Sequence, residues 1–161
     1  MRRLLCLNLS VVLLLSLLSG CGQHLKEPVT FYYLRNAYED KMDCPIAGEQ
    51  REASGNRDNL KYTLSLYLMG PIGKDLVSPL PRGTVLYTVK QENGTLTIEL
   101  SNTSALLSDS EFSLACACLS LTCMGLTNTE AVTIVSGNRS LTLSRDNLLL
   151  GDTVTPEETA K

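Results

Sequence analysis

Residues 108–125 constrain the fold of this chain more than any other segment. Ser108 and Glu111 have the spacing of a capping box, which predicts the start of a helix, and Gly125 is expected to end it. Between them, apolar side chains surround nearly the whole helix: Phe112, Leu114, Ala115, Cys116, Ala117, Cys118, Leu119, Leu121, Cys123 and Met124. A helix that covers one face of a sheet needs only one apolar stripe, so something else must cover the remainder.

Three candidates could cover the remaining apolar surface of this helix: a predicted helix over residues 59–69, the segment 35–58, or another molecule. Exposed apolar patches are rare on monomeric proteins, which favours a cover from the same chain. If another molecule provides it, this helix and a sheet edge form the partner-binding surface. The exposed residues would then be found among Cys116, Ala117, Leu119 and Cys123.

The other segments predict an α+β domain. Alternating or β-branched runs predict strands over residues 29–34, near 49–53, and over 84–90, 95–100, 132–136 and 141–144. Asp58 can cap the helix over 59–69, Gly70-Pro71 stops it, and Asn93-Gly94 is a strong hairpin signal. Leaving aside the short strand near 49–53, the order β-α-β-β-α-β-β favours a small two-layer domain, with two helices on one face of a mixed sheet.

The first 20 residues have the features of a lipoprotein signal peptide. Arg2 and Arg3 precede a leucine-rich run over residues 4–18, and Ser19 and Gly20 stand directly before Cys21. This lipobox predicts that Cys21 receives a diacylglyceryl group, that the chain is cut before it, and that a further acyl chain such as palmitate is added. Two or more acyl chains make a durable anchor. The expected location is the extracytoplasmic face of the cell membrane; an uncleaved N-terminal anchor is the alternative.

Removing the signal peptide leaves one domain's worth of chain. Residues 21–28 read as a lipidated tether, 29–145 as the folded domain, and 146–161 as a disordered C-terminal tail because they are poor in apolar residues. Loss of the two signal-peptide arginines leaves 12 basic against 17 acidic residues, a net charge of −5. An acidic chain without a basic stripe is not expected to bind nucleic acid.

Four cysteines remain after Cys6 leaves with the signal peptide and Cys21 takes the lipid: Cys44, Cys116, Cys118 and Cys123. Helix geometry prevents the last three from bridging one another or converging on one zinc ion. They are therefore predicted to be buried, reduced thiols. A disulfide between Cys44 and one of the helix cysteines is the alternative.

Few residues offer catalytic or metal-binding chemistry. His24, the sole histidine, lies in the tether, and Glu39, Asp40 and Asp43 read as a solvated charge cluster. The sequence predicts no enzyme, no cofactor and no metal site. The leading alternative is an envelope enzyme or accessory factor that acts on peptidoglycan through a carboxylate, with Glu49, Asp75 or Glu111 as candidates. A ligand-binding lipoprotein is a third option, although the domain leaves little room for a pocket.

Several segments together resemble the GerM (sporulation and germination) domain. They are Glu49-x-Arg51, residues 64–71 ending in Gly70-Pro71, residues 80–84, residues 94–101, the helix from Glu111 to Thr122, and residues 132–137. The resemblance covers about residues 29–145. It implies a non-enzymatic domain similar to ring-building modules, in a membrane-associated protein that assembles or binds an envelope complex. The partner stays unnamed, with a homo-oligomer open. The helix cysteines and the single domain copy depart from the GerM pattern.

Overall fold

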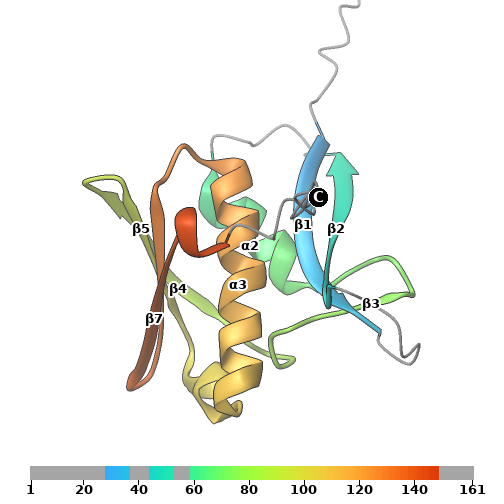
Figure 1. Cartoon of the computed structure of the whole chain (residues 1–161). Coiled ribbons are helices and arrows are strands. Elements are labelled where there is room, and N and C mark those ends of the chain that lie inside the picture. The colour runs from blue at the N-terminus through green and yellow to red at the C-terminus, as the bar shows by residue number, and fades with distance from the viewer. Residues whose placement is uncertain (1–27, 37–43, 53–58, 149–161) are drawn as a thin grey trace, which may run out of the picture.

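The computed structural model describes residues 28–36, 44–52 and 59–148. Its strands form two sheets (Figure 1). The first is antiparallel, in the order β2-β1-β3: β1 is Pro28–Arg35, β2 is Ile46–Glu52 and β3 is Leu76–Val77. The second has the order β4-β5-β6-β7: β4 is Leu86–Glu92, β5 is Thr95–Leu100, β6 is Ala131–Ser136 and β7 is Arg139–Ser144. Only β5 and β6 are parallel in this sheet. The α+β class is therefore confirmed.

The predicted hairpin between β4 and β5 forms at Asn93 and Gly94, whose φ angles are 49° and 76°. Positive φ at both positions is what a two-residue hairpin turn of the favoured twist requires. The β5 strand then presents Leu96, Ile98 and Leu100 to the core, each at most 1% exposed. The predicted alternation along this strand is confirmed.

The helices are α2 (Leu60–Leu68), α3 (Asp109–Leu126) and two 3-10 turns, η1 (Asn102–Leu106) and η2 (Asp146–Leu148). The capping box at Ser108 and Glu111 is present. Gly125 does not end α3, because it has no positive φ and the helix runs on to a cap at Thr127. In α2 the cap is Asn59, whose side chain accepts from the Tyr62 N–H; Asp58 lies outside the described residues.

Helix α3 lies between the two sheets, with β1 on one side and β6 and β7 on the other (Figure 1). The expected single sheet with both helices on one face is therefore replaced by two sheets around a central helix. At Tyr32 the edge of β1 is occupied by α3, because the Tyr32 N–H donates to the Thr122 hydroxyl at 2.9 Å. A strand of the second sheet cannot pair at a position that the helix already fills.

This arrangement explains why α3 is apolar on nearly all sides. Cys116, Leu119 and Cys123 are 0–2% exposed, and Ala117 is half-buried. Three of the four residues named for a partner-binding surface on α3 therefore belong to the core, and only Ala117 is partly exposed. The cover comes from strands on both sides of the helix rather than from a second molecule.

Two arginines hold the ends of α3. Arg139 lies over the Phe112 ring at 4.1 Å and donates to Asp109 at 2.9 Å, near the start of the helix. Arg145 donates to the carbonyl of Met124 at 3.1 Å, near the end, where cations are favoured by the helix dipole. Both arginines come from the last part of the described chain, which therefore fixes the position of the central helix.

The boundaries of the domain differ slightly from the sequence prediction. The order β1, β2, α2, β3, β4, β5, α3, β6, β7 adds the two-residue strand β3 to the predicted elements, and β2 begins earlier than expected. At the C-terminal end the ordered domain continues past residue 145, because η2 follows there and its Leu148 packs against the core. The expected disorder is therefore wrong for residues 146–148, while 149–161 lie outside the described residues.

Candidate functional site

An aromatic cluster supports the region of the candidate site. Tyr33 of β1 and Tyr67 of α2 stack with ring centroids 4.8 Å apart, and Phe31 meets Tyr67 edge to face. The Tyr33 hydroxyl donates to the carbonyl of Tyr67, and the Tyr67 hydroxyl donates to that of Tyr32. Burial raises the pKa of Tyr33 to about 12, so both rings stay neutral hydrogen-bond donors. These contacts fix α2 on the first sheet.

The Glu49-x-Arg51 segment of β2 connects this cluster to the end of α2. Residues two apart on a strand share a face, and the Glu49 carboxylate accepts from Arg51 Nε at 2.5 Å. Arg51 also donates to the carbonyl of Gly70 at 2.7 Å and lies over the rings of Phe31 and Tyr33 at 5.1 and 5.7 Å. Its guanidinium therefore satisfies a carbonyl at the C-terminal end of α2.

Glu49 holds the turn that follows Gly70. Its carboxylate accepts from the N–H groups of Ile72 and Gly73 at 2.9 and 2.8 Å. Desolvation raises its pKa, but the hydrogen bonds from Gly73 and Arg51 outweigh that effect, and the pKa lies below its ordinary value. The Glu-x-Arg pair and the Gly-Pro segment, far apart in sequence, thus form one structural unit.

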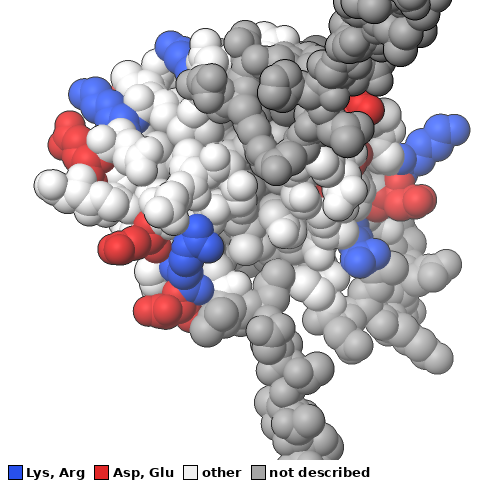
Figure 2. All heavy atoms as spheres, turned by 90° about the horizontal axis from the view of Figure 1, so that it is seen from above, with Lys and Arg blue, Asp and Glu red and all other residues white. Residues whose placement is uncertain are grey.

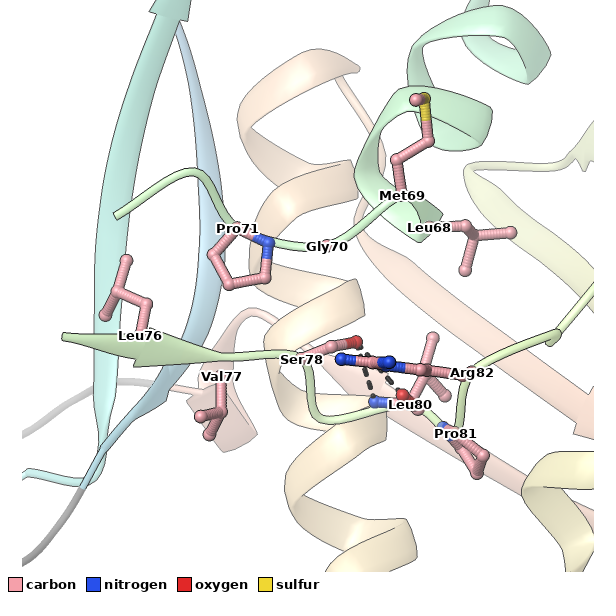
Figure 3. Close-up of a pocket in the computed structure, with 10 residues that line it drawn as sticks. All are labelled: Leu68, Met69, Gly70, Pro71, Leu76, Val77, Ser78, Leu80, Pro81 and Arg82. Atoms are coloured by element: carbon pink, nitrogen blue, oxygen red, sulfur yellow. Dashed lines mark hydrogen bonds between the residues drawn. The ribbon is translucent and has the colours of Figure 1, made fainter. Parts of the chain in front are cut away.

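The turn that Glu49 and Arg51 hold, together with the end of α2, borders a groove with a volume of about 430 Å³ (Figure 3). One wall is the end of α2 and the following turn, and the other is β3 with the loop after it. The lining residues are Leu68, Met69, Gly70, Pro71, Leu76, Val77, Ser78, Leu80, Pro81 and Arg82. Of the sequence motifs, the Gly-Pro stop and the start of the segment 80–84 meet here.

Two of the exposed large apolar side chains of the described chain, Met69 and Val77, line this groove. The described chain has seven of them, and six lie within residues 62–87: Tyr62, Met69, Ile72, Val77, Val85 and Tyr87. Met69 is 81% exposed and Ile72 is 78% exposed. Sequence analysis did not select these residues, because their exposure depends on how α2 and β3 pack. The one sequence feature that could have indicated them is the pair of apolar residues, Met69 and Ile72, on either side of Gly70-Pro71.

Arg82 brings a positive charge to the groove. Its side chain is exposed and points across the pocket towards Ser78 in Figure 3. Within the described part of the chain, the two ion pairs are those of Arg51 with Glu49 and Arg139 with Asp109, so neither involves Arg82. The guanidinium is therefore available to an anionic group from outside.

The three candidate catalytic carboxylates lie on different elements. Glu49 is occupied as described above. Glu111 accepts from Ser108 in the capping box, and these hydrogen bonds lower its pKa. Asp75 is exposed in the turn before β3. Among the residues with described positions, no group of three or more His, Cys, Asp or Glu side chains is placed to hold a metal ion.

The helix cysteines are buried as expected. Cys116, Cys118 and Cys123 are at most 1% exposed, whereas Cys44 is half-buried, and all four are free thiols. Burial raises the pKa of Cys116 and Cys118 to about 12, and that of Cys123 is raised as well. The alternative disulfide from Cys44 is not formed in this structure.

Thiol labelling is expected to separate the two classes of cysteine. At pH 8 the three helix thiols are almost entirely protonated and inaccessible, so a maleimide should modify Cys44 at least tenfold faster in the native protein. In urea the three helix cysteines should label as fast as Cys44. Mass spectrometry of tryptic peptides measures each rate; rapid native labelling of all three helix cysteines would contradict their burial.

Several predicted residues lie outside the described part of the chain: Cys21, His24, Glu39, Asp40 and Asp43. No helix in the described ranges is long and apolar enough to cross a membrane. On the face in Figure 2, acidic and basic side chains lie interspersed around the rim. Mixed charges of this kind do not form the basic stripe that nucleic-acid binding uses.

Residues 30–142 match the family model Germane, described as sporulation and spore germination. The chain belongs to the Germane family. The tandem GerMN domains of the sporulation protein GerM from Bacillus subtilis share its fold, with a TM-score of 0.52 and 18% identity over 70% of this chain. This chain covers 39% of that one. The resemblance to the GerM domain is therefore confirmed.

A second solved structure, described as a lipoprotein from Clostridium perfringens, matches the present protein with 16% identity and a TM-score of 0.44. The match covers 80% of this chain and 95% of the other. A comparison with curated proteins found no significant match. The family membership links the chain to sporulation and germination.

Proposed function

We propose that this protein is a lipid-anchored, non-catalytic module of the cell envelope that assembles or binds an envelope complex during sporulation or germination. The observation that carries the proposal is the groove with two exposed apolar side chains in its lining, Met69 and Val77, and the exposed Ile72 in the turn that follows Pro71. Apolar surface of this kind marks protein-interaction sites. Membership of the Germane family supports the link to sporulation and germination.

The proposed anchor at Cys21 limits the distance of the domain from the membrane. Residues 21–27 can span at most about 25 Å before β1 starts at Pro28. The N-terminal end of β1 then lies within about 25 Å of the membrane surface. The groove lies at the other end of this strand, where Val77 pairs with Leu34, roughly 20 Å further along β1. The groove is therefore separated from the tether by most of the length of β1.

The leading alternative is an enzyme acting through a carboxylate, and two of its three candidates are already engaged in local structure, while the third, Asp75, is exposed in the turn before β3. Glu49 and Glu111 both use their oxygens to hold local structure, with several backbone or side-chain donors each. A general acid or base must instead direct its carboxyl at a substrate. A binding role is therefore the better explanation of this surface.

The anchor is tested by replacing Cys21. In cells fed an alkyne fatty acid, Cys21→Ala is expected to reduce the label on the protein at least tenfold and to release it from the membrane fraction or leave it unprocessed. Two acyl chains supply the membrane affinity in this proposal, so nothing else should retain the cleaved protein. Cys6→Ala is the matched control and should keep full labelling. A label that persists on Cys21→Ala would refute the proposal.

The role is tested by genetic complementation in a spore-forming host that lacks its own copy. The double variant Met69→Gln/Ile72→Gln removes exposed apolar surface from the groove at Met69 and from the adjacent turn at Ile72 without adding charge, and should yield at least tenfold fewer heat-resistant or germinating spores. Leu106→Gln is the control, because Leu106 is 87% exposed but lies in η1. Both proteins should accumulate equally in immunoblots. Full restoration by the double variant would show that the groove is not the functional surface.

A further inference from the structure

We infer that the groove binds an extended, acidic segment of a partner protein, which adds a strand to the outer edge of β3 and places a carboxylate on Arg82. The inference rests on the proposed function and specifies the partner's chemistry. Its first support is the sheet order β2-β1-β3, which leaves β3 at an edge. Among the described strands none pairs with β3 on the side away from β1. Edges of this kind accept strands from other chains.

The groove has a composition that suits an extended peptide. Its β3 wall offers the carbonyl of Leu76 and the side chains of Leu76 and Val77, while the Leu76 N–H already donates to the Gly73 carbonyl at 3.3 Å. The opposite wall ends in Gly70-Pro71, where the φ of Gly70 is +90° and Arg51 and Glu49 fix the turn. A volume of about 430 Å³ holds one or two partner side chains rather than a large cofactor. A rigid wall reduces the entropy lost when a peptide binds.

Arg82 selects the charge of the segment. It is a groove-lining cation without an ion pair in the described structure, and its planar guanidinium suits bidentate pairing with a carboxylate. The chain as a whole is acidic, with a net charge of −3. Two copies therefore repel each other overall, and a highly charged acidic partner would be repelled as well, so the partner segment needs one carboxylate at Arg82 rather than a large negative charge.

The inference is tested with two soluble, fluorescent peptides of alternating valine and threonine that differ only in a central aspartate or lysine. Binding to the full-length protein in detergent micelles is measured by fluorescence anisotropy. We expect the aspartate peptide to bind about tenfold more tightly than the lysine peptide. Arg82→Glu should reverse this preference. Lys90→Glu, which changes the net charge equally on the exposed part of β4, should leave it unchanged.

Strand addition has its own test. Methylating alternate backbone nitrogens of the aspartate peptide removes donors to β3 and should weaken binding at least tenfold. Equal binding of the methylated peptide would overturn strand addition. Equal or absent binding of both charged peptides, or an unchanged preference in Arg82→Glu, would overturn the inference. The spore counts of the groove variants judge the proposed function separately, because they do not depend on a chosen peptide.

Two other occupants of the groove are distinguished by the same assay. The chain's own residues 149–161 include Asp152, Glu157 and Glu158. If neutralising these three residues in the full chain strengthens binding of the aspartate peptide tenfold, the tail occupies the groove and the inference fails. It also fails if light scattering shows a dimer that Arg82→Glu dissociates, since the occupant is then a second copy. Tail-independent peptide binding by a monomer supports it.

Discussion

Leu119→Ala is expected to lower the free energy of unfolding by about 3 kcal/mol. Leu119 is 2% exposed in the middle of α3, so truncation removes buried contacts and leaves a cavity. Two sheets cover this helix, which limits how far the surroundings can collapse into the space. Urea unfolding followed by circular dichroism measures the change.

The control for this prediction is Leu106→Ala, at a leucine that is 87% exposed. The same truncation there should change the free energy of unfolding by less than about 0.5 kcal/mol. If Leu119→Ala were equally mild and instead abolished complex formation, α3 would be a binding surface after all. Loss of stability together with loss of binding would identify the helix as core.

Arg51→Ala is expected to cost about 2–3 kcal/mol of unfolding free energy. The side chains of Arg51 and Glu49 are only 16% and 13% exposed. Removing Arg51 therefore leaves the Glu49 carboxylate poorly solvated and the Gly70 carbonyl without its donor. Arg51→Lys keeps the charge but lacks the planar fork, and should recover less than half of the loss. A lysine variant as stable as wild type would show that charge alone suffices.

The same pair predicts a loss of stability in acid. The pKa of Glu49 is lowered from 4.5 in the folded state, so its contribution is complete above that value and is lost as the pH falls through the lowered pKa. Glu111 has the same sign, because Ser108 lowers its pKa. The stability difference between wild type and Glu49→Gln should therefore be largest above about pH 5 and shrink below 4. A difference independent of pH would contradict this account.

Local chemistry made several features predictable from sequence. The Asn93-Gly94 turn needs positive φ angles that these residue types tolerate, and the capping box at Ser108 needs only Glu111, three positions away. The resemblance of Glu49-x-Arg51 to a family segment also located an important pair. Its partners in the turn after Gly70 could not be read from spacing, because about twenty residues separate them in the chain.

The sequence by itself determined most of the strands, the capping box of α3, the hairpin and the need to cover α3 on several sides, because each depends on residues a few positions apart. Only the tertiary structure decided what the cover is: β1 reaches α3 through the hydrogen bond from Tyr32 to Thr122, ninety positions apart, and the sheet divides in two. The groove has the same origin, since Met69, Val77 and Arg82 share it only after α2 and β3 have packed. Burial and exposure are properties of long-range packing, and residue type alone does not specify them.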